Sequence, residues 1–358
     1  MIYMVVGTRP EIIKMAPVVR ACEKENVEYG IIHTGQHYSY ELDKIFFDEL
    51  ELPRPEHNLD IGSGTHAEET GRALAGIEKI LMEEKPDVVL VEGDTNSVLA
   101  GALAASKIHI KVGHVEAGLR SYSRRMPEEI NRVLVDHISD YLFAPTENAK
   151  GILLGEGIPG EKIFVTGNTI VDSIYQNLEI ANRKSGILKR LNLEKEGYFL
   201  VTVHRAENVD VRKRLDGVID ALGKLKERFG LPIIYPVHPR ALKQLGNFNI
   251  DVRKMEDNVT MIKPVGFLDF LHLEANAKLV LTDSGGVQEE TCVLRVPCVT
   301  LRDNTERPET VDAGSNILAG CDPEKIIKSA DVMLGRERNW KNPFGGGNAG
   351  EKIIDILK

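Results

Sequence analysis

The chain has 358 residues, which is more than one ordinary hydrophobic core needs and suits two domains. Hydrophobic residues make up 42% and charged residues 28%, as in soluble globular proteins, and no apolar run approaches the roughly 20 residues that span a bilayer. The formal net charge of −9 argues against general nucleic-acid binding, although local charge in a cleft can still hold an anionic ligand.

Short apolar runs alternate with amphipathic stretches along the whole chain. The first run, 2–6, follows no basic leader, so we interpret it as a strand rather than a signal peptide and expect a cytoplasmic protein. Further strands are predicted at 29–33, 88–91, 112–115, 141–144, 162–165, 199–203, 233–237, 259–262, 279–281 and 298–301. Helices are predicted between them, for example over 11–24, 68–84, 128–138, 213–229 and 289–294. This alternation predicts an α/β fold with parallel sheets covered by helices on both faces.

The alternation falters near 167–172 and resumes with a long charged helix over 173–191. We therefore expect two domains, one formed by residues 1–168 and the other by residues 169–344. A glycine tract at 345–347 precedes a short final helix over 349–357. We expect that helix to cross back onto the first domain, so residues 345–358 are grouped with 1–168.

Several cofactor signatures are missing from the sequence. The four cysteines match no zinc spacing and are too few for a disulfide framework, so buried thiols are expected; they are Cys22, Cys292, Cys298 and Cys321. No Gly-x-Gly-x-x-Gly follows a predicted strand, which disfavours a dinucleotide redox cofactor. Grouped carboxylates could hold two metal ions, but no ligand spacing supports that reading. The sequence therefore predicts neither a cofactor nor a metal.

The residues that follow the predicted strands are unusually rich in Arg, His and Glu. These segments are 8–11, 35–37, 92–95, 116–120, 204–208, 238–240, 283–290 and 302–308. Loops with a purely structural purpose favour Gly, Asn, Asp, Ser and Pro instead. Because open parallel sheets bind ligands beyond the carboxyl ends of their strands, the enrichment predicts one cleft shared by the two domains.

The run at 279–281 breaks directly into Gly285-Gly286 and a helix start, with Ser284 before them. A helix start offers free backbone N–H groups and a partial positive charge, and glycines allow close approach, so this turn predicts an anion site, above all for phosphate. Arg9, after the first strand, can hold a phosphate in a two-point contact. Lys14 lies one helical turn further and either reaches the same anion or is a plain surface charge.

Acidic and histidine side chains complete the predicted chemistry. Asp94 and Glu116 each follow an apolar strand. An unpaired carboxylate in such a place destabilises the fold, so a functional role is the better explanation for it. Crowded carboxylates raise one another's pKa, which makes acid and base roles available near neutral pH. Glu128 opens a helix and serves either as an acid or as a helix-dipole partner. A histidine at a strand end is more often structural, but His204 and His238 end two strands in corresponding places, which shifts the balance toward a role in the site.

Nine motifs, in order and over nearly the whole chain, carry a resemblance to a known family. They are GTRPEIIKMAP at 7–17, TGQH at 34–37, EGDT at 92–95, HVEAGLRS at 114–121, PEEINR at 127–132, VTGN at 165–168, TVHRAEN at 202–208, DSGGVQEE at 283–290 and TERPE at 305–309. Together they resemble the non-hydrolysing UDP-N-acetylglucosamine 2-epimerases.

The resemblance implies two Rossmann-like domains of the glycosyltransferase-B type, with the site in the cleft between them. It also implies a homodimer that interconverts UDP-GlcNAc and UDP-ManNAc without a cofactor, through loss of UDP to 2-acetamidoglucal and its re-addition. The acids Asp94, Glu116 and Glu128 and the histidine His204 match the family's catalytic positions. The matching nucleotide-sugar contacts are Arg9, Lys14, His238 near the diphosphate, Phe270 on uracil, Ser284, Gly285, Gly286, Glu290 on the ribose hydroxyls, and Arg307.

The chain departs from the family in two places. Bacterial members often follow TGQH with a further Gln and Met, in a region that binds a second, activating UDP-GlcNAc, whereas residues 36–41 keep Gln36 and lack the second Gln. A basic insert at 122–125 has no assigned role. Three alternatives stay open: a hydrolysing epimerase that releases ManNAc and UDP, a glycosyltransferase of the same fold, and a silent nucleotide-sugar sensor. The three acids argue against the glycosyltransferase, which needs fewer.

Overall fold

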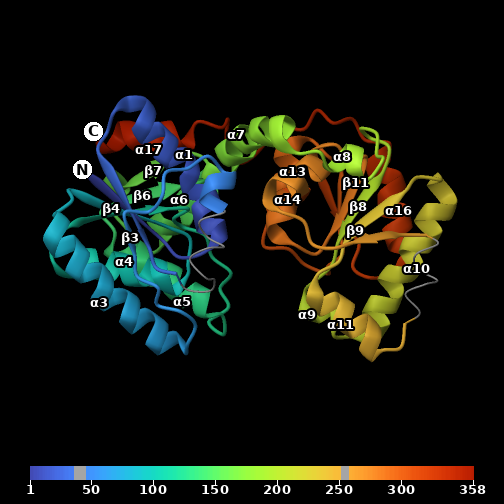
Figure 1. Ribbon diagram of the computed structural model, residues 1–358, viewed down its shortest axis with the longest axis horizontal. Helices are drawn as coiled ribbons and strands as arrows, with labels where there is room; N and C mark the ends of the chain where they lie inside the picture. Colours follow the sequence, from blue (N-terminus) through green and yellow to red (C-terminus); the bar gives the residue numbers. More distant parts are fainter. Residues whose placement is uncertain (36–45, 251–257) are drawn as a thin grey trace. The chain divides into compact units, whose positions relative to one another are not determined.

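The computed structural model describes residues 1–35, 46–250 and 258–358. The chain divides into two compact units, Met1–Gln176 with Phe344–Lys358, and Asn177–Pro343. Each unit is built on one parallel sheet with helices packed against it (Figure 1). The predicted α/β fold with two Rossmann-like domains is therefore confirmed.

The first unit contains a seven-stranded parallel sheet in the order β3-β2-β1-β4-β5-β6-β7. Its strands are β1 (Ile2–Val6), β2 (Tyr29–His33), β3 (His57–Asn58), β4 (Val88–Glu92), β5 (Lys111–Val115), β6 (Tyr141–Ala144) and β7 (Ile163–Val165). All residues of β1 and β4 are buried, because helices cover both faces of the sheet. β1, β4 and β5 are direct neighbours, so their carboxyl ends lie along one edge of the sheet.

The helices of the first unit are α1 (Arg9–Glu25), α3 (His66–Glu84), α4 (Asn96–Lys107), α5 (Pro127–Ile138), α6 (Glu147–Gly155) and α17 (Ala349–Leu357), with a 3-10 turn, η1, at Gly160–Lys162. Figure 1 shows the C-terminal helix α17 beside α1. Gly350 makes this close packing possible, since a Cβ there would lie 2.7 Å from the carbonyl oxygen of Pro17. The predicted return of the last helix to the N-terminal domain is confirmed.

One predicted helix is divided in the structure. The helix expected over 173–191 is α7 (Thr169–Lys184), which leads from the first unit into the second, followed by the short α8 (Ile187–Arg190). Ser185 and Gly186 separate them. Glycine costs roughly 0.5–1 kcal/mol in a helix interior relative to alanine, so the break falls where continued helix is least stable.

The second unit contains a six-stranded parallel sheet in the order β10-β9-β8-β11-β12-β13. Its strands are β8 (Phe199–Thr202), β9 (Ile233–Pro236), β10 (Thr260–Ile262), β11 (Leu279–Thr282), β12 (Cys298–Thr300) and β13 (Asn316–Leu318). Its remaining helices are α9 (Ala206–Val209), α10 (Arg212–Phe229), α11 (Pro239–Asn247), α13 (Phe267–Ala275), α14 (Gly285–Leu294), α15 (Pro308–Asp312) and α16 (Pro323–Leu334). β8 pairs with β11 and β11 with β12, which brings the segments after these three strands to one edge.

Three further observations bear on the sequence predictions. All four cysteines are free thiols, and three of them are buried. Among the described residues, no helix is both long and apolar enough to cross a membrane. The predicted loop residues Gln36 and His37, and the departure from the family at 36–41, lie outside the described residues.

Candidate active site

The first cluster forms at the carboxyl ends of β4 and β5. Glu92, the last residue of β4, is only 1% exposed. The Lys14 ammonium, on α1, lies 3.0 Å from Glu92 Oε1 and also pairs with the carboxylate of Glu116, to which Asn168 Nδ2 donates at 3.4 Å. Burial raises the pKa of Glu92 well above its usual range; Lys14 opposes this rise, and the neighbouring Glu116 adds to it. The structure thus brings together Lys14 and Glu116, and adds Glu92.

Glu116 has a backbone conformation that few residues adopt. Its φ of +69° lies in the left-handed region, which is sterically unfavourable for a residue with a Cβ. Such strain persists only where surrounding structure enforces it, and it is frequent at functional sites. The strained backbone therefore supports a functional role for Glu116, whose carboxylate it directs toward Lys14.

Asp94 lies in the loop that follows β4 and is held from α5. Its carboxylate pairs with Arg132, and its backbone oxygen accepts a hydrogen bond of 2.9 Å from Asn131 Nδ2. Arg132 also lies 3.0 Å from Glu129 Oε2. Residues of α5 therefore hold both the Asp94 carboxylate and the backbone of its loop. Asp94 remains partly exposed, as a group that meets a ligand must be.

Glu128 and Glu129, adjacent at the start of α5, have different surroundings. Glu129 is buried and accepts hydrogen bonds from the backbone N–H groups of Ser121 and Tyr122 at 2.9 and 2.8 Å. Burial acts to raise its pKa, but these hydrogen bonds outweigh burial, so the pKa is lowered. Glu129 therefore holds a loop. Glu128 is exposed, and its assignment as a catalytic acid remains a prediction.

A buried ion network supports the loops that carry Asp94 and Glu116. Asp136, on α5, lies 2.6 Å from His114 Nδ1 and 2.7 Å from Arg120 Nη1, and it accepts a hydrogen bond from the backbone N–H of Gly118. The other ring nitrogen of His114 lies 2.8 Å from the carbonyl oxygen of Gly93. One carboxylate thus ties together the residue before Asp94 and the turn after Glu116.

Arg9 opens α1 at the end of β1, where its guanidinium lies 5.4 Å from the ring centre of Phe46. Glu11, in the first turn of α1, is buried and accepts a hydrogen bond of 2.6 Å from the backbone N–H of Gly7. Burial raises the pKa of Glu11 to about 7, although hydrogen bonds from Thr95, Gly7 and Thr8 oppose the rise. The β1–α1 turn therefore combines a cation with a carboxyl group that titrates near neutral pH.

The second cluster, in the second unit, is built on the start of α14. Ser284 caps this helix, with its Oγ accepting from the N–H of Val287, and its own N–H donates to Thr282 Oγ1 at 3.0 Å. Gly285 is buried and Gly286 is exposed. The predicted helix started at 289, whereas α14 begins at Gly285, because the serine cap and the glycines already belong to its first turn.

Buried Asp283 orients His204. Its carboxylate accepts from the backbone N–H groups of His204 and Arg205 and lies 3.2 Å from the ring Nδ1 of His204. Burial acts to raise the pKa of Asp283, but the His204 ring and these hydrogen bonds lower it. The rings of His204 and His238 lie 5.5 Å apart, and burial, with His204 nearby, lowers the pKa of His238. The structure thus brings the two predicted histidines together.

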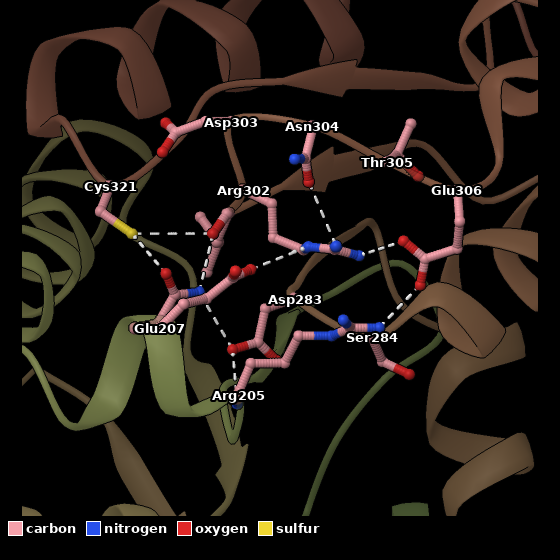
Figure 2. Close-up of polar contacts among 12 residues, drawn as sticks. Arg205, Glu207, Asp283, Ser284, Arg302, Asp303, Asn304, Thr305, Glu306 and Cys321 are labelled. Atoms are coloured by element: carbon pink, nitrogen blue, oxygen red, sulfur yellow. Dashed lines mark hydrogen bonds and ion pairs between the residues drawn. The ribbon is translucent and has the colours of Figure 1, made fainter. Parts of the chain in front are cut away.

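An arginine–glutamate network covers the same strand ends (Figure 2). Glu306 lies 2.7 Å from Arg205 Nη2 and 2.6 Å from Arg302 Nη1, and Arg302 also reaches Glu207 at 3.0 Å. Burial acts against ionisation of Glu306, but the two arginines outweigh it and lower its pKa to about 2. A Cβ on Gly285 would lie 2.7 Å from Glu306 Oε1, so this carboxylate sits against the start of α14.

The remaining predicted contacts surround α14. Arg307 Nε lies 2.8 Å from Glu289 Oε1. Half-buried Phe270 packs against the core formed by Tyr198, Val280 and their neighbours. Glu290 is half-buried and faces the fully buried Glu274, whose pKa is raised well above its usual range by burial and by Glu290.

Sequence reasoning missed several residues of both clusters. Glu92 and Asp283 had an available signal, because each is the first residue of a motif that follows a strand, EGDT at 92–95 and DSGGVQEE at 283–290. Asp136 acts through His114 and Arg120, which no local pattern reveals. Arg302 and Glu306 lie in the strand-end segment 302–308 and pair with each other, but their further partners Glu207 and Arg205 are distant in sequence. Among the described residues, no group of three or more His, Cys, Asp or Glu side chains is placed to hold a metal.

The fold and the two clusters define a class: a two-domain Rossmann-like protein with grouped acids in one domain and a glycine-led helix start with histidines and arginines in the other. A family model described as UDP-N-acetylglucosamine 2-epimerase matches residues 20–358. The chain belongs to this family, as its motifs predicted.

Similar proteins agree with this assignment. The UDP-N-acetylglucosamine 2-epimerase of Methanocaldococcus jannaschii is 59% identical, over 99% of this chain and 98% of that protein. A crystal structure of the M. jannaschii UDP-GlcNAc 2-epimerase in complex with UDP-GlcNAc and UDP has a TM-score of 0.86 and covers 99% of each chain. The UDP-2,3-diacetamido-2,3-dideoxy-D-glucuronate 2-epimerase of Pseudomonas aeruginosa is 42% identical, over 99% of each chain.

Proposed function

We propose that this protein is a non-hydrolysing epimerase that interconverts UDP-GlcNAc and UDP-ManNAc and supplies activated ManNAc for glycan synthesis. The observation that carries the proposal is the group of carboxylates at the ends of β4 and β5, where Lys14 contacts both Glu92 and Glu116. The hydrogen on carbon 2 of the sugar is not acidic, because no carbonyl adjoins it. Its removal and return therefore require positioned acids and bases.

The reaction that suits these groups is elimination and re-addition. A base removes the hydrogen from carbon 2 while the bond from carbon 1 to UDP breaks, giving 2-acetamidoglucal. UDP then adds back to carbon 1 as an acid delivers a proton to the opposite face of carbon 2. Asp94, Glu116 and Glu128 are the proposed acid and base groups, and two faces require more than one of them.

The second cluster is the proposed binding site for UDP. The backbone N–H groups at the start of α14, with Ser284, Gly285 and Gly286, suit the diphosphate, because a helix N-terminus attracts anions. The ring centres of His204 and His238 lie 5.5 Å apart, and both rings can form hydrogen bonds to phosphate oxygens and to the leaving oxygen. We further propose that Arg9 contacts phosphate and that Arg307 contacts the nucleotide. Glu290 is proposed to bind the ribose hydroxyls, and Phe270 to pack on uracil.

A further feature of the proposed function is that the active form is a homodimer. A second candidate substrate comes from the P. aeruginosa relative, whose name specifies a UDP-diacetamido-glucuronate. Its carboxylate would need a cation near the sugar, so the two substrates should be compared directly.

The test is turnover by the purified protein. UDP-GlcNAc should be converted to UDP-ManNAc at the same rate with and without added NAD, as followed by proton NMR. Free ManNAc that accumulates in step with UDP would instead identify a hydrolysing epimerase. Faster conversion of the diacetamido-glucuronate would make that sugar the substrate.

Two conservative variants locate the chemistry. Asp94→Asn and Glu116→Gln should each lower kcat by roughly 10²–10⁴-fold, the usual contribution of a general acid or base. The Kd for UDP, measured by calorimetry, should change little. An equal loss of UDP affinity and activity would assign these residues to structure rather than to proton transfer.

A further inference from the structure

Glu92 forms a compact buried cluster with two other ionisable groups. It closes β4, Glu116 follows the neighbouring strand β5, and Lys14 bridges their carboxyl groups from α1. The side chains of Glu92 and Glu116 are 2% and 6% exposed, so water does little to stabilise separate charges there. Glu11, also on α1, is a further carboxyl group whose charge raises the pKa of Glu92.

Glu92 and Glu116 share the ammonium group of Lys14, and Glu11 adds a third carboxyl group whose charge acts on Glu92. Two carboxylates that share one site cannot readily ionise together, so the pair holds one proton. The more deeply buried Glu92 is the group whose pKa is raised well above its usual range, by burial first.

We propose that Glu92 holds this proton and exchanges it with Glu116 during turnover, which makes Glu92 a proton-relay partner that positions and resets the catalytic Glu116. The proposal rests on the proposed function, in which Glu116 transfers a proton to or from the sugar. Lys14 stabilises whichever carboxyl group is ionised. Glu92 acts through Glu116 and need not touch the substrate.

The proton movements balance in both directions. When Glu116 acts as an acid, it first receives the single proton of the pair from Glu92. The new O–H bond of Glu116 then breaks as the C1–C2 π electrons of 2-acetamidoglucal take the proton to form the C2–H bond. A β-phosphate oxygen of UDP bonds to carbon 1 in the same step. Water returns one proton to the pair before the next turnover. In the reverse direction the pair first releases its proton to water. Glu116 then accepts the proton from carbon 2 as the bond from carbon 1 to UDP breaks, and passes that proton to Glu92.

The decisive variant is Glu92→Gln. Glutamine matches the neutral carboxyl in shape and keeps an oxygen that can face the Lys14 ammonium, but it cannot release a proton. The relay predicts a fall in kcat of about 10²-fold or more, in the range of a lost acid–base group, with KM and the Kd for UDP within about twofold of wild type. A kcat within twofold of wild type would refute the relay.

Two comparison variants separate proton transfer from structure. Asp172→Asn alters another buried carboxyl of the first unit, whose pKa burial also raises and which accepts from the N–H of Gly350 at 3.0 Å. It should keep wild-type kcat, and an equal loss there would contradict a specific role for Glu92. Glu92→Asp retains a carboxyl group and should be at least tenfold more active than Glu92→Gln; equal activity of the two would also refute the relay.

The outcome distinguishes this inference from the proposed function. If wild-type protein epimerises UDP-GlcNAc and Glu92→Gln does so equally well, the relay fails and the proposed function stands. If wild-type protein shows no 2-epimerase turnover, the proposed function fails and the relay with it. Thermal melts of each variant identify any that fail to fold, and Glu92→Asp then decides the question if Glu92→Gln is among them.

Discussion

Asp136→Asn tests whether the buried ion network of the first unit supports both the fold and the loops of the site. The wild-type carboxylate is fully buried and contacts His114 at 2.6 Å, Arg120 at 2.7 Å and the N–H of Gly118 at 3.2 Å. Asparagine has nearly the same shape, so it creates no cavity. It removes the negative charge that the buried guanidinium of Arg120 and the buried ring of His114 share.

The expected cost is large because the charges are buried. Removing one partner of a buried ion pair costs roughly 3–5 kcal/mol, since the other partner is left uncompensated. For a domain of this size, each kcal/mol lowers Tm by roughly 2–4 °C, so a fall of roughly 6–20 °C is expected. His114 also holds the carbonyl of Gly93, so the loop with Asp94 should loosen and kcat should fall.

The pH dependence of this effect has a definite sign. Burial opposes ionisation of Asp136, but His114 and Arg120 outweigh it and lower the pKa. A carboxyl whose pKa is lower in the folded state contributes stability above its unfolded pKa of roughly 3.9 and loses it as the pH falls through the folded value. The difference in stability between wild type and Asp136→Asn should therefore be full at pH 7 and shrink below about pH 4.

The assay is a thermal melt followed by circular dichroism at pH 7 and at pH 3.5 to 4, with a surface variant beside it. Asp331→Asn breaks the exposed ion pair with Arg228 and should shift Tm by no more than about 4 °C, because exposed pairs contribute roughly 0–1 kcal/mol. If Asp136→Asn melts within 2 °C of wild type at pH 7, the network does not stabilise the unit as described.

Three further predictions concern single positions. Gly118→Ala should destabilise the protein by more than about 2 kcal/mol in urea unfolding, because Gly118 has a φ of +84° and a Cβ would lie 2.5 Å from the carbonyl oxygen of Ala149. Gly151→Ala, whose Cβ would meet nothing within 4 Å, should be neutral or stabilising, and equal losses at both positions would refute this. Because the pKa of Glu11 is raised to about 7, its contribution to stability is complete below about pH 4.5 and is lost as the pH rises through 7, so Glu11→Gln should flatten the fall in the wild-type free energy of unfolding across that window. Glu306→Gln should tighten UDP binding severalfold in calorimetry, because it removes a negative charge from the start of α14; unchanged or weaker binding would contradict a diphosphate site there.

Much of the fold follows from local sequence patterns. The apolar run of β4, with all five residues buried, is a clear strand because a parallel strand covered on both faces needs apolar side chains throughout. β13 was not predicted, since Asn316–Leu318 is short and begins with a polar residue. β3 has only two residues, and it too escaped prediction. Such short edge strands form because a neighbouring strand pairs with them.

The sequence was sufficient to predict which positions form the candidate site. It was not sufficient to predict which of their side chains contact one another. Strand ends identified Asp94, Glu116 and His204, because ligand sites of parallel sheets lie there. The sequence could not reveal that Lys14 bridges Glu116 and Glu92, since this contact joins a helix to two strands far along the chain. Nor could it separate buried Glu129 from exposed Glu128, because both occupy the first turn of α5.

In the proposed reaction, the bond between hydrogen and carbon 2 of the sugar breaks and forms again. Turnover of UDP-GlcNAc in deuterated water, followed by NMR and mass spectrometry, tests it directly. The UDP-ManNAc formed should carry one deuterium at carbon 2, and it should form without NAD. Epimerised product that carries only hydrogen at carbon 2 would contradict this reaction.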